Sequence, residues 1–492
     1  MDRLRRWIFW ACGLLVLFWI TPELWARLGG GGGYSGGGGG GGGGGYSGGG
    51  GGSGDGAEII FIWIEFSFRY PLCGIPGNLL LFYIIYKIHS DQQESTVIAR
   101  QPVAPPNWDT LRQFDANFSE VLFRDFGYSL FAKIHEARGS GQFNRYSQYL
   151  SENAMLDLTA LNSQPDVKDV QGVVVGGLTV RNLEVPAGPK EHVSVRLVYE
   201  ANYTEVTVTG ERAVYSRQAW VLSRRAGVLS PEPDRINSLD CVGCGSPLEP
   251  QPDGTCPHCG NQYERGEHHW FVTGITELNR REVGPALTSK AADVGLDLPT
   301  IRDANLEQKR ARLIEAYPDM DFQVAVARFQ HIYHTLQKSW SEQDLDQLRP
   351  FETDSLFQNH RYWVEEYRRQ NLRNVLNDVI LDNIELVKIR SDKFYDAITC
   401  RLFASMIDYT QDENGKVMCG STSRSTRFSE YWTFVRGRGA SDNTKGDTVC
   451  PNCAAELKIS MAGECEYCGS KLTSGQFDWV LSEIQQDEEY AG

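Results

Sequence analysis

Apolar residues at intervals of three and four predict an amphipathic helix at two places beyond residue 107. A second helical stretch and three strand-like segments follow each of these helices, so the same order of elements occurs twice. The apolar faces of the two helices consist of Phe118, Leu122, Phe126, Leu130 and Ile134, and of Phe322, Phe329, Tyr333, Leu336 and Trp340. The later elements span residues 143–156, 173–181, 193–210 and 213–224 in the first series, and 354–372, 381–390, 395–409 and 426–438 in the second.

The last predicted strand of each series carries a tryptophan, Trp220 in one and Trp432 in the other. A cysteine-rich segment follows each strand, and after it comes a short aromatic–apolar tag, Trp270-Phe271-Val272 or Trp479-Val480-Leu481. Helices followed by an antiparallel sheet are typical of an α+β fold. We therefore predict two α+β domains in which helices pack on an antiparallel sheet.

The two cysteine-rich segments share the spacing C-x2-C-x11-C-x2-C. Two C-x-x-C hairpins can present four thiolates to one ion in the tetrahedral geometry that zinc prefers. Four thiolates leave no open coordination position, so we expect two structural Zn²⁺ ribbons; rubredoxin-like iron and redox dithiols are the alternatives. The predicted metal ligands are Cys241, Cys244, Cys256 and Cys259 in ribbon 1, and Cys450, Cys453, Cys465 and Cys468 in ribbon 2.

The N-terminal part of the chain has the composition of membrane segments joined by a linker. Residues 1–28 combine three early arginines with the apolar run Trp7–Ile20, which suits a cleaved signal or an uncleaved anchor equally. Residues 29–57 are glycine-rich and predict a disordered tether. Residues 58–89 predict a transmembrane segment: a kinked spanning helix, an interfacial helix with a short span, or a re-entrant hairpin.

Charge places the remainder of the chain in the cytoplasm. Arginines at the start of the chain should stay cytoplasmic, so the tether lies outside and the second membrane segment returns the chain to the cytoplasm. That compartment also keeps the eight thiols reduced. The chain has 63 acidic against 48 basic residues, a formal charge of −15, which argues against nucleic acid as a partner.

The sequence offers little support for an enzyme. Neither a His-Asp-Ser nor a Cys-His grouping recurs between the two series, and H-E-x-x-H is absent. Asp408 is the best single candidate for catalysis, although its position before the Asp412–Gly415 segment suits a turn residue. The isolated histidines are His268, His269, His331, His334 and His360, and we expect packed or solvated roles for them.

The second series resembles the Tim44-like domain, named for a peripheral subunit of the mitochondrial inner-membrane import translocase. The residues that carry the resemblance are Asp321-Phe322, Phe329, Trp340, Asp344-Leu345, Leu348–Phe351, Asp408-Tyr409, Gly420 and Phe428–Arg436. The first series resembles it only in outline, because its tryptophan strand reads Arg217-Gln218-Ala219-Trp220. The resemblance implies a cone similar to nuclear-transport-factor-two-like proteins, partners that are membrane lipid or protein, and no catalytic residues.

The N-terminal layout is similar to that of bacterial members of this family. The resemblance therefore implies a non-enzymatic scaffold, tethered to a bacterial inner membrane, that binds protein clients or lipid. The alternatives are a small-molecule-binding or enzymatic cone pair, and docking of a ribosome or RNA. Arg224, Arg225, Arg436 and Arg438 either face anionic lipid or an acidic partner, or lie at solvated strand ends. The predicted domains are residues 107–236 (first Tim44-like), 238–263 (ribbon 1), 305–440 (second Tim44-like), 447–472 (ribbon 2) and 473–492 (a tail with a disordered acidic end).

Overall fold

The computed structural model describes most of the chain beyond residue 105. The predicted signal or anchor (1–28), tether (29–57) and transmembrane segment (58–89) lie outside the described residues. Among the helices that are described, none is both long and apolar enough to cross a membrane. The described residues are 106–492 except 163–166, 187–190, 234–240, 242–243, 247–254, 263, 283–286, 288–294, 441–447 and 488–489.

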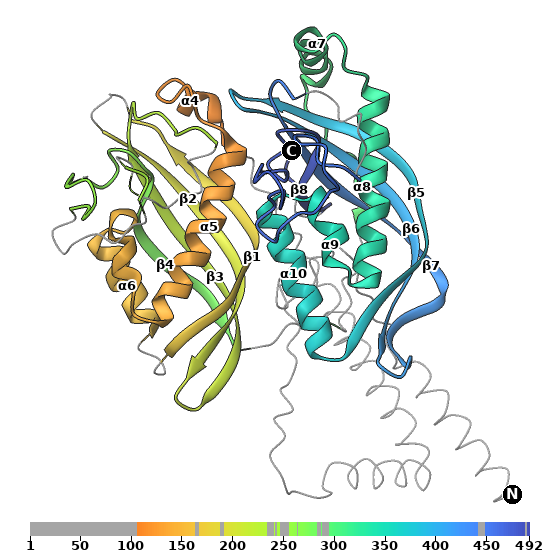
Figure 1. The fold of residues 1–492 in the computed structure, drawn as a ribbon, viewed down its shortest axis with the longest axis horizontal. Coiled ribbons are helices and arrows are strands. Elements are labelled where there is room, and N and C mark those ends of the chain that lie inside the picture. The colour runs from red at the N-terminus through yellow and green to blue at the C-terminus, as the bar shows by residue number, and fades with distance from the viewer. Residues whose placement is uncertain are drawn as a thin grey trace, which may run out of the picture. The chain divides into compact units, whose positions relative to one another are not determined.

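The first half of the described chain, residues 106–282, consists of helices that lie on one face of a four-stranded antiparallel sheet (Figure 1). The strands follow one another in the sheet in their order along the chain. The helices are α4 (Trp108–Arg112), α5 (Glu120–Gly139), the 3-10 helix η1 (Phe143–Tyr149) and α6 (Glu152–Asn162). The strands are β1 (Val167–Glu184), β2 (His192–Thr207), β3 (Gly210–Arg225) and β4 (Phe271–Arg281).

The second half, residues 295–492, has the same arrangement (Figure 1). Its sheet is also antiparallel, with the order β5-β6-β7-β8. The helices are η2 (Gly295–Asp297), α7 (Leu306–Ala316), α8 (Phe322–Glu342), α9 (Leu345–Leu348), η3 (Arg349–Phe351) and α10 (Asp354–Arg369). The strands are β5 (Leu372–Ser391), β6 (Tyr395–Asp412), β7 (Val417–Gly437) and β8 (Val480–Gln486).

Side-chain caps mark where the two main helices begin. Ser119 accepts a hydrogen bond from the backbone N–H of Leu122, and Asp321 accepts one from Gln323, so each satisfies a donor that the helix leaves unpaired. The apolar faces of α5 and α8 are buried as predicted, except that Phe322 is only partly buried. The predicted fold of helices on antiparallel sheets is therefore confirmed.

Aromatic side chains fill the space between helices and sheet in both halves. In the first half the rings of Phe131 and Trp220 lie 5.0 Å apart. In the second, the Phe329 and Phe434 rings stack at 3.9 Å, and Tyr333 lies 5.2 Å from Trp432.

The aromatic–apolar tags are strands, which the sequence did not predict. The last two residues of each tag are the first two residues of a strand, β4 in the first half and β8 in the second. Each of these strands pairs with the tryptophan strand of its own half. Each cysteine-rich segment is therefore an insertion between the third and fourth strands of a sheet. Burial does not alternate regularly along β4 or β8, so a two-residue period does not reveal these strands, and only the pairing partner identifies each one.

The prediction that residues 473–492 form a tail outside the domain is wrong for β8, which is a strand of the second sheet. The prediction that the acidic end is disordered is wrong for Asp487. The Asp487 carboxylate is buried and lies 2.8 Å from the guanidinium of Arg401 on β6. Tyr490 stacks on Tyr431 of β7 with ring centroids 3.7 Å apart. The end of the chain therefore covers part of the sheet face opposite the helices.

The linker before α7 covers the same face of the second sheet. The backbone carbonyl of Leu298 and the hydroxyl of Thr300 both accept hydrogen bonds from Arg401, at 2.9 Å each. The backbone N–H of Ile301 donates to the Tyr431 hydroxyl at 2.9 Å. Both faces of this sheet are thus packed, which explains the buried polar residues on its outward-facing positions.

The N-terminal turns of α5 contact the second half. Leu122 packs with Tyr395, Ala397, Val435 and Val480 rather than with the core of its own half. Ion pairs surround this apolar contact: Glu120 pairs with Arg390, and Arg124 lies 3.4 Å from Glu483. The Ser355 hydroxyl donates to Asp125 at 3.0 Å.

Candidate metal centres

Each C-x-x-C pair forms a tight hairpin in which the first cysteine makes two backbone hydrogen bonds. In ribbon 1 the N–H of Cys241 donates to the carbonyl of Ser246 at 2.8 Å, and the N–H of Gly245 donates back to Cys241 at 2.7 Å. The same pattern occurs in the other three hairpins. Gly245 has a φ of +70°, and Ala454 adopts φ +59° at the equivalent place in ribbon 2. The turn therefore imposes a left-handed conformation, for which glycine is the least strained residue.

The hairpins bring the sulfur atoms of each predicted quartet together. The four sulfurs of a quartet all lie within 4.8 Å of one another. In ribbon 1 the Cys241–Cys259 and Cys244–Cys256 sulfurs are 3.8 Å apart. In ribbon 2 the corresponding distances are 3.8 Å for Cys450–Cys468 and 3.9 Å for Cys453–Cys465.

These distances test whether the residues fit a metal ion. A zinc–sulfur bond of about 2.3 Å in a tetrahedron places neighbouring sulfurs about 3.8 Å apart, whereas a disulfide requires about 2.05 Å. The described cysteines form no disulfide. Both quartets therefore have the geometry of an S4 metal site that can hold Zn²⁺. Within the described residues, these quartets are the sole groups of three or more candidate metal ligands.

Local hydrogen bonds favour the thiolate form at Cys256 and Cys468, whereas desolvation and hydrogen bonds with the other three thiols of its quartet raise the pKa of Cys453 to about 11. The backbone N–H groups of Cys259 and His258 lower the pKa of the Cys256 thiol to about 6. In ribbon 2 the Ser470 hydroxyl and the Asn452 amide lower the pKa of Cys468 to about 6. One sulfur in each ribbon is thus stabilised in its negatively charged form by nearby donors, and those of Cys468 come from both hairpins of ribbon 2.

Ribbon 2 is held to its half by a network around Asp354, the first residue of α10. Lys471 lies 2.6 Å from one carboxylate oxygen, and the Thr473 hydroxyl donates to the other at 3.0 Å. Arg349 also pairs with Asp354, and its Nε donates to the carbonyl of Met461 at 3.1 Å. Gly463 has φ +80°, and a Cβ there would overlap Thr473 and Arg349. The ribbon and the start of α10 therefore form one packed unit.

Ribbon 1 connects to its half through the residues that follow it. The carbonyl of Gly266 accepts from the backbone N–H of Arg225 at 2.9 Å, and the Arg225 side chain lies 3.2 Å from Glu267. The Nε of Arg265 donates to the carbonyl of Ser147 at 2.9 Å. These contacts fix the end of the ribbon beside the last residues of β3.

The structure does not assemble the predicted histidines into a site. His331 and His334 are exposed on α8, and His268 is exposed after ribbon 1. His269 packs against Tyr149 with ring centroids 5.4 Å apart, and burial lowers its pKa to about 4. His360 is buried and its Nδ1 contacts the carboxylate of Glu352. Each described histidine of this set is therefore solvated or packed.

Asp408 is not a turn residue. It lies inside β6 with its side chain buried, and it accepts a hydrogen bond from the Asn374 amide at 2.7 Å. Asn374 in turn accepts from the indole N–H of Trp340 at 2.8 Å. The turn is made instead by Asp412, whose carboxylate accepts from the backbone of Asn414 and Lys416. Asp408 thus joins a buried polar chain that links strand and helix.

The lipid-facing role considered for the strand-end arginines is wrong for Arg224 and Arg436. Both are 2% exposed. The Arg224 guanidinium pairs with the carboxylate of Asp115 and lies 4.5 Å from the Trp270 ring. The Arg436 guanidinium lies 4.7 Å from the Trp479 ring. In each half the tryptophan of the tag therefore covers the arginine of the preceding strand.

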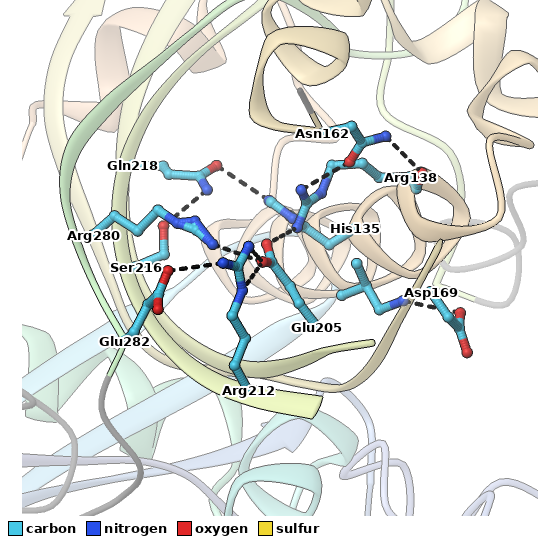
Figure 2. Close-up of polar contacts among 11 residues, drawn as sticks. His135, Arg138, Asn162, Asp169, Glu205, Arg212, Ser216, Gln218, Arg280 and Glu282 are labelled. Carbon is cyan, nitrogen blue, oxygen red and sulfur yellow. Dashed lines mark hydrogen bonds and ion pairs between the residues drawn. The ribbon is translucent and has the colours of Figure 1, made fainter. Parts of the chain in front are cut away.

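The sequence analysis did not predict a second buried cluster, which consists of charged side chains around Glu205. Glu205 on β2 contacts Arg138, Arg212 and Arg280, which lie far from one another along the chain (Figure 2). The one local signal is the alternation of β2. Every second residue from Val193 to Tyr203 is apolar and buried, and Glu205 is the next residue on that same face. Its partners could not be identified, because they come from α5, β3 and β4.

Each half has helices on one face of a four-stranded antiparallel sheet and an insertion with four cysteines. The class of protein is therefore a pair of α+β domains with candidate metal ribbons. Residues 310–446 match the Tim44-like domain, so this part of the chain contains such a domain. The match covers α8 to β7 and ends before ribbon 2 and β8. No curated protein shows significant similarity to the chain.

Proposed function

We propose that the protein is a membrane-associated, non-enzymatic scaffold that binds a protein client or lipid through its Tim44-like domain. The Tim44-like domain at residues 310–446 is the observation that carries this proposal, because its family is a membrane-associated family of scaffolds and adaptors. The finer elements of the proposal are the tether, the duplication, the metal and the compartment. Each rests on a separate feature of the chain.

The duplication is supported by two contacts that recur in both halves. The indole N–H of Trp220 donates to the Gln218 side chain at 2.9 Å, and that of Trp432 donates to Glu430 at 3.0 Å. The arginine–tryptophan contacts of the two tags repeat in the same way. We infer that the first half is a divergent copy of the Tim44-like domain. The copies differ at the residue two before the tryptophan, where an amide replaces a carboxylate.

The ribbons act as structural braces in this proposal. Each one joins the third and fourth strands of a sheet, and metal binding would contribute folding free energy to a segment too small to fold alone. Four sulfur ligands leave no position for a substrate or water, which supports a structural rather than a catalytic metal. The bound ion that we propose is Zn²⁺ at both quartets.

The proposed location is a bacterial inner membrane, with both halves on the cytoplasmic side. The apolar segment at 58–89 would anchor the protein, and the glycine-rich residues 29–57 would join it to the first segment. The reducing cytoplasm suits the eight ribbon thiols. Compartment and anchor are read from the sequence alone.

The proposal of a non-enzymatic role is supported by the surroundings of the side chains that were considered as catalytic candidates. Asp408 and His360 are buried in polar contacts of the core. Aromatic rings occupy the space between α8 and its sheet. A chain with a formal charge of −15 also offers no general attraction to RNA, so a protein or lipid partner is the better candidate.

Crosslinking of the full-length protein in native membranes, followed by mass spectrometry, tests the proposal. We expect crosslinks from lysines of the second half to a recurrent membrane protein or client, and these should resist high salt. A chain that yields only self-crosslinks and no lipid adduct would contradict the scaffold role. For the compartment, a membrane-impermeant thiol reagent should leave Cys453 unmodified in intact cells and should label it after lysis under chelation.

A further inference from the structure

Two carboxylates, one from each half, lie near each other where α10 meets α5. The Ser355 hydroxyl on α10 donates to Asp125 on α5 at 3.0 Å. The residue before Ser355 is Asp354, and burial, followed by repulsion from Asp354, raises the pKa of Asp125. Besides α5, α10 packs against β1 of the first half. The start of α10 therefore contributes to the contact between the halves, and the contact contains two like charges at this point.

A small cavity lies beside Asp125 in the same contact. Its volume is about 20 Å³, which is space for about one water molecule. Asp125, Ser355 and Glu483 line it together with Glu120, Val121, Arg124, Tyr128, Arg390 and Ser482. Most of these side chains are charged or polar. The strength of the contact here therefore depends on the balance of charges as well as on the apolar packing of Leu122.

A cation of ribbon 2, Lys471, attracts both carboxylates. Its ammonium lies 2.6 Å from Oδ2 of Asp354. In spite of burial, Arg349 and Lys471 lower the pKa of Asp354, and Lys471 also opposes the rise in the pKa of Asp125. Arg349 belongs to η3 rather than to the ribbon. Lys471 is thus a charge that the contact between the halves receives from ribbon 2.

The position of Lys471 depends on the cysteine quartet. Lys471 forms an antiparallel bridge with Glu464, the residue before the candidate ligand Cys465. It also follows the candidate ligand Cys468 by three residues. The N–H of Cys465 donates to the carbonyl of Ser470 at 2.9 Å. A metal bound to the four sulfurs would fix both strands of this bridge, because small segments of this kind fold with their metal.

We propose that the metal at ribbon 2 controls how tightly the two halves contact each other. With the metal bound, Lys471 is held beside Asp354 and offsets its repulsion with Asp125. When the metal is lost, Lys471 is no longer held there, and the repulsion weakens the contact at the first turns of α5. The inference rests on the proposed metal at ribbon 2. It is independent of which client or lipid the protein binds.

Hydrogen exchange of the full-length protein, followed by mass spectrometry, tests the inference. The measured quantity is the exchange rate of residues 120–126 at the start of α5 divided by that of residues 132–138 near its end. Cys465→Ser should raise this ratio by about two- to tenfold, the effect of a partly exposed ionic contact on local opening. Cys256→Ser is the matched control in ribbon 1, whose Arg265 and Glu267 contact Ser147 and Arg225 of the first half, and it should leave the ratio unchanged.

Lys471→Gln separates the charge of Lys471 from the folding of the ribbon. This variant keeps all four cysteines, so its zinc content should equal that of the wild type, and its exchange ratio should rise as in Cys465→Ser. Lys458→Gln is the control, because Lys458 is an exposed lysine of the same ribbon that pairs with Glu456. Asp125→Asn in the Lys471→Gln background should restore slow exchange, since it removes one of the two like charges.

The proposal is overturned if Lys471→Gln, with its full zinc content, exchanges as the wild type does. An equal rise of the ratio in Cys465→Ser and Cys256→Ser would also overturn it. A wild-type protein without metal at ribbon 2 would contradict this inference and the proposed zinc site together. Full metal content with no response at the start of α5 would contradict this inference alone.

Discussion

Arg401 and Asp487 form an ion pair that fastens the end of the chain to the second sheet. Their Nε and Oδ1 atoms are 2.8 Å apart, and the two side chains are 2% and 1% exposed. The Ser429 hydroxyl donates to the other carboxylate oxygen at 2.6 Å. Residues that are distant in the chain thus complete one buried network, and it lies on the face of the sheet opposite the helices.

Asp487→Ala should therefore destabilise the second half strongly. The change leaves the buried Arg401 guanidinium without its counter-ion, which costs about 3–5 kcal/mol in comparable pairs. Urea unfolding monitored by tryptophan fluorescence measures the effect. Glu365→Ala, which removes the partly exposed partner of Arg361, is the control and should change the free energy of unfolding by less than about 0.5 kcal/mol. Equal effects of the two variants would contradict the packing of the tail.

Asp125→Asn should stabilise the protein at pH 8 and have little effect at pH 4. Burial, and then repulsion from Asp354, raises the pKa of Asp125 from 3.8 to about 7. The charged form is thus disfavoured in the folded state, and the resulting penalty grows between pH 3.8 and 7 and is complete above pH 7. The asparagine removes a penalty on the order of 1–3 kcal/mol while it still accepts from Ser355. Melting temperatures across this pH range provide the measurement.

Glu120→Gln should show the opposite pH dependence, which makes it the matched control. Glu120 is buried, but Arg390 and Arg124 lower its pKa from 4.5 to about 2. Its charge therefore stabilises the folded state above pH 4.5, and this contribution is lost as the pH falls from 4.5 to 2. The glutamine variant should be less stable than the wild type at pH 8 and similar to it near pH 2. Parallel curves for the two variants would refute the electrostatic account of this contact.

The purified protein should contain two zinc ions per chain. Cys256→Ser and Cys465→Ser should each lower the content to one, because each removes a ligand from a different quartet. Inductively coupled plasma mass spectrometry gives the metal and its stoichiometry. Iron in place of zinc would alter the identity of the ion but not the ligand set. A wild-type protein that carries no metal when purified without chelators would contradict both sites.

Arg349→Ala should speed the loss of metal from ribbon 2 without affecting ribbon 1. Arg349 joins the ribbon carbonyl of Met461 to Asp354 and packs 4.6 Å from the Phe357 ring. Its loss frees the ribbon from the start of α10. Release of zinc to a chromophoric chelator should become biphasic, with one phase faster than in the wild type. Arg349→Lys should restore little of the slow release, since lysine cannot form the same fork of contacts. Arg369→Ala, on the exposed side of α10, is the control and should leave the kinetics of zinc release unchanged.

Helices and strands could be predicted from local patterns, because the residues that form each pattern lie close together in the chain. The 3.6-residue period of Leu130 and Ile134 identifies the buried face of α5, and alternation from Ile398 to Met406 identifies β6. The cysteine spacing likewise defines both quartets, since each hairpin closes between residues that are near in the chain, as Cys241 and Ser246 are. The aromatic tags and the tail were misread because β8 depends on pairing with β7, and Asp487 depends on a partner more than eighty residues earlier.

The sequence by itself determined the main helices and the first three strands of each half, the two quartets and the Tim44-like character of the second series, all of which follow from periodicity, spacing and motif. The tertiary structure alone decided which charges are buried together. Arg224 and Arg436 look like solvated strand ends in the sequence, and they lie under tryptophans in the fold. Glu205 meets its arginines only because the sheet brings β2, β3 and β4 side by side beneath α5. A buried charge is tolerated when its counter-charges are near in space, and nearness in space is a property of the fold.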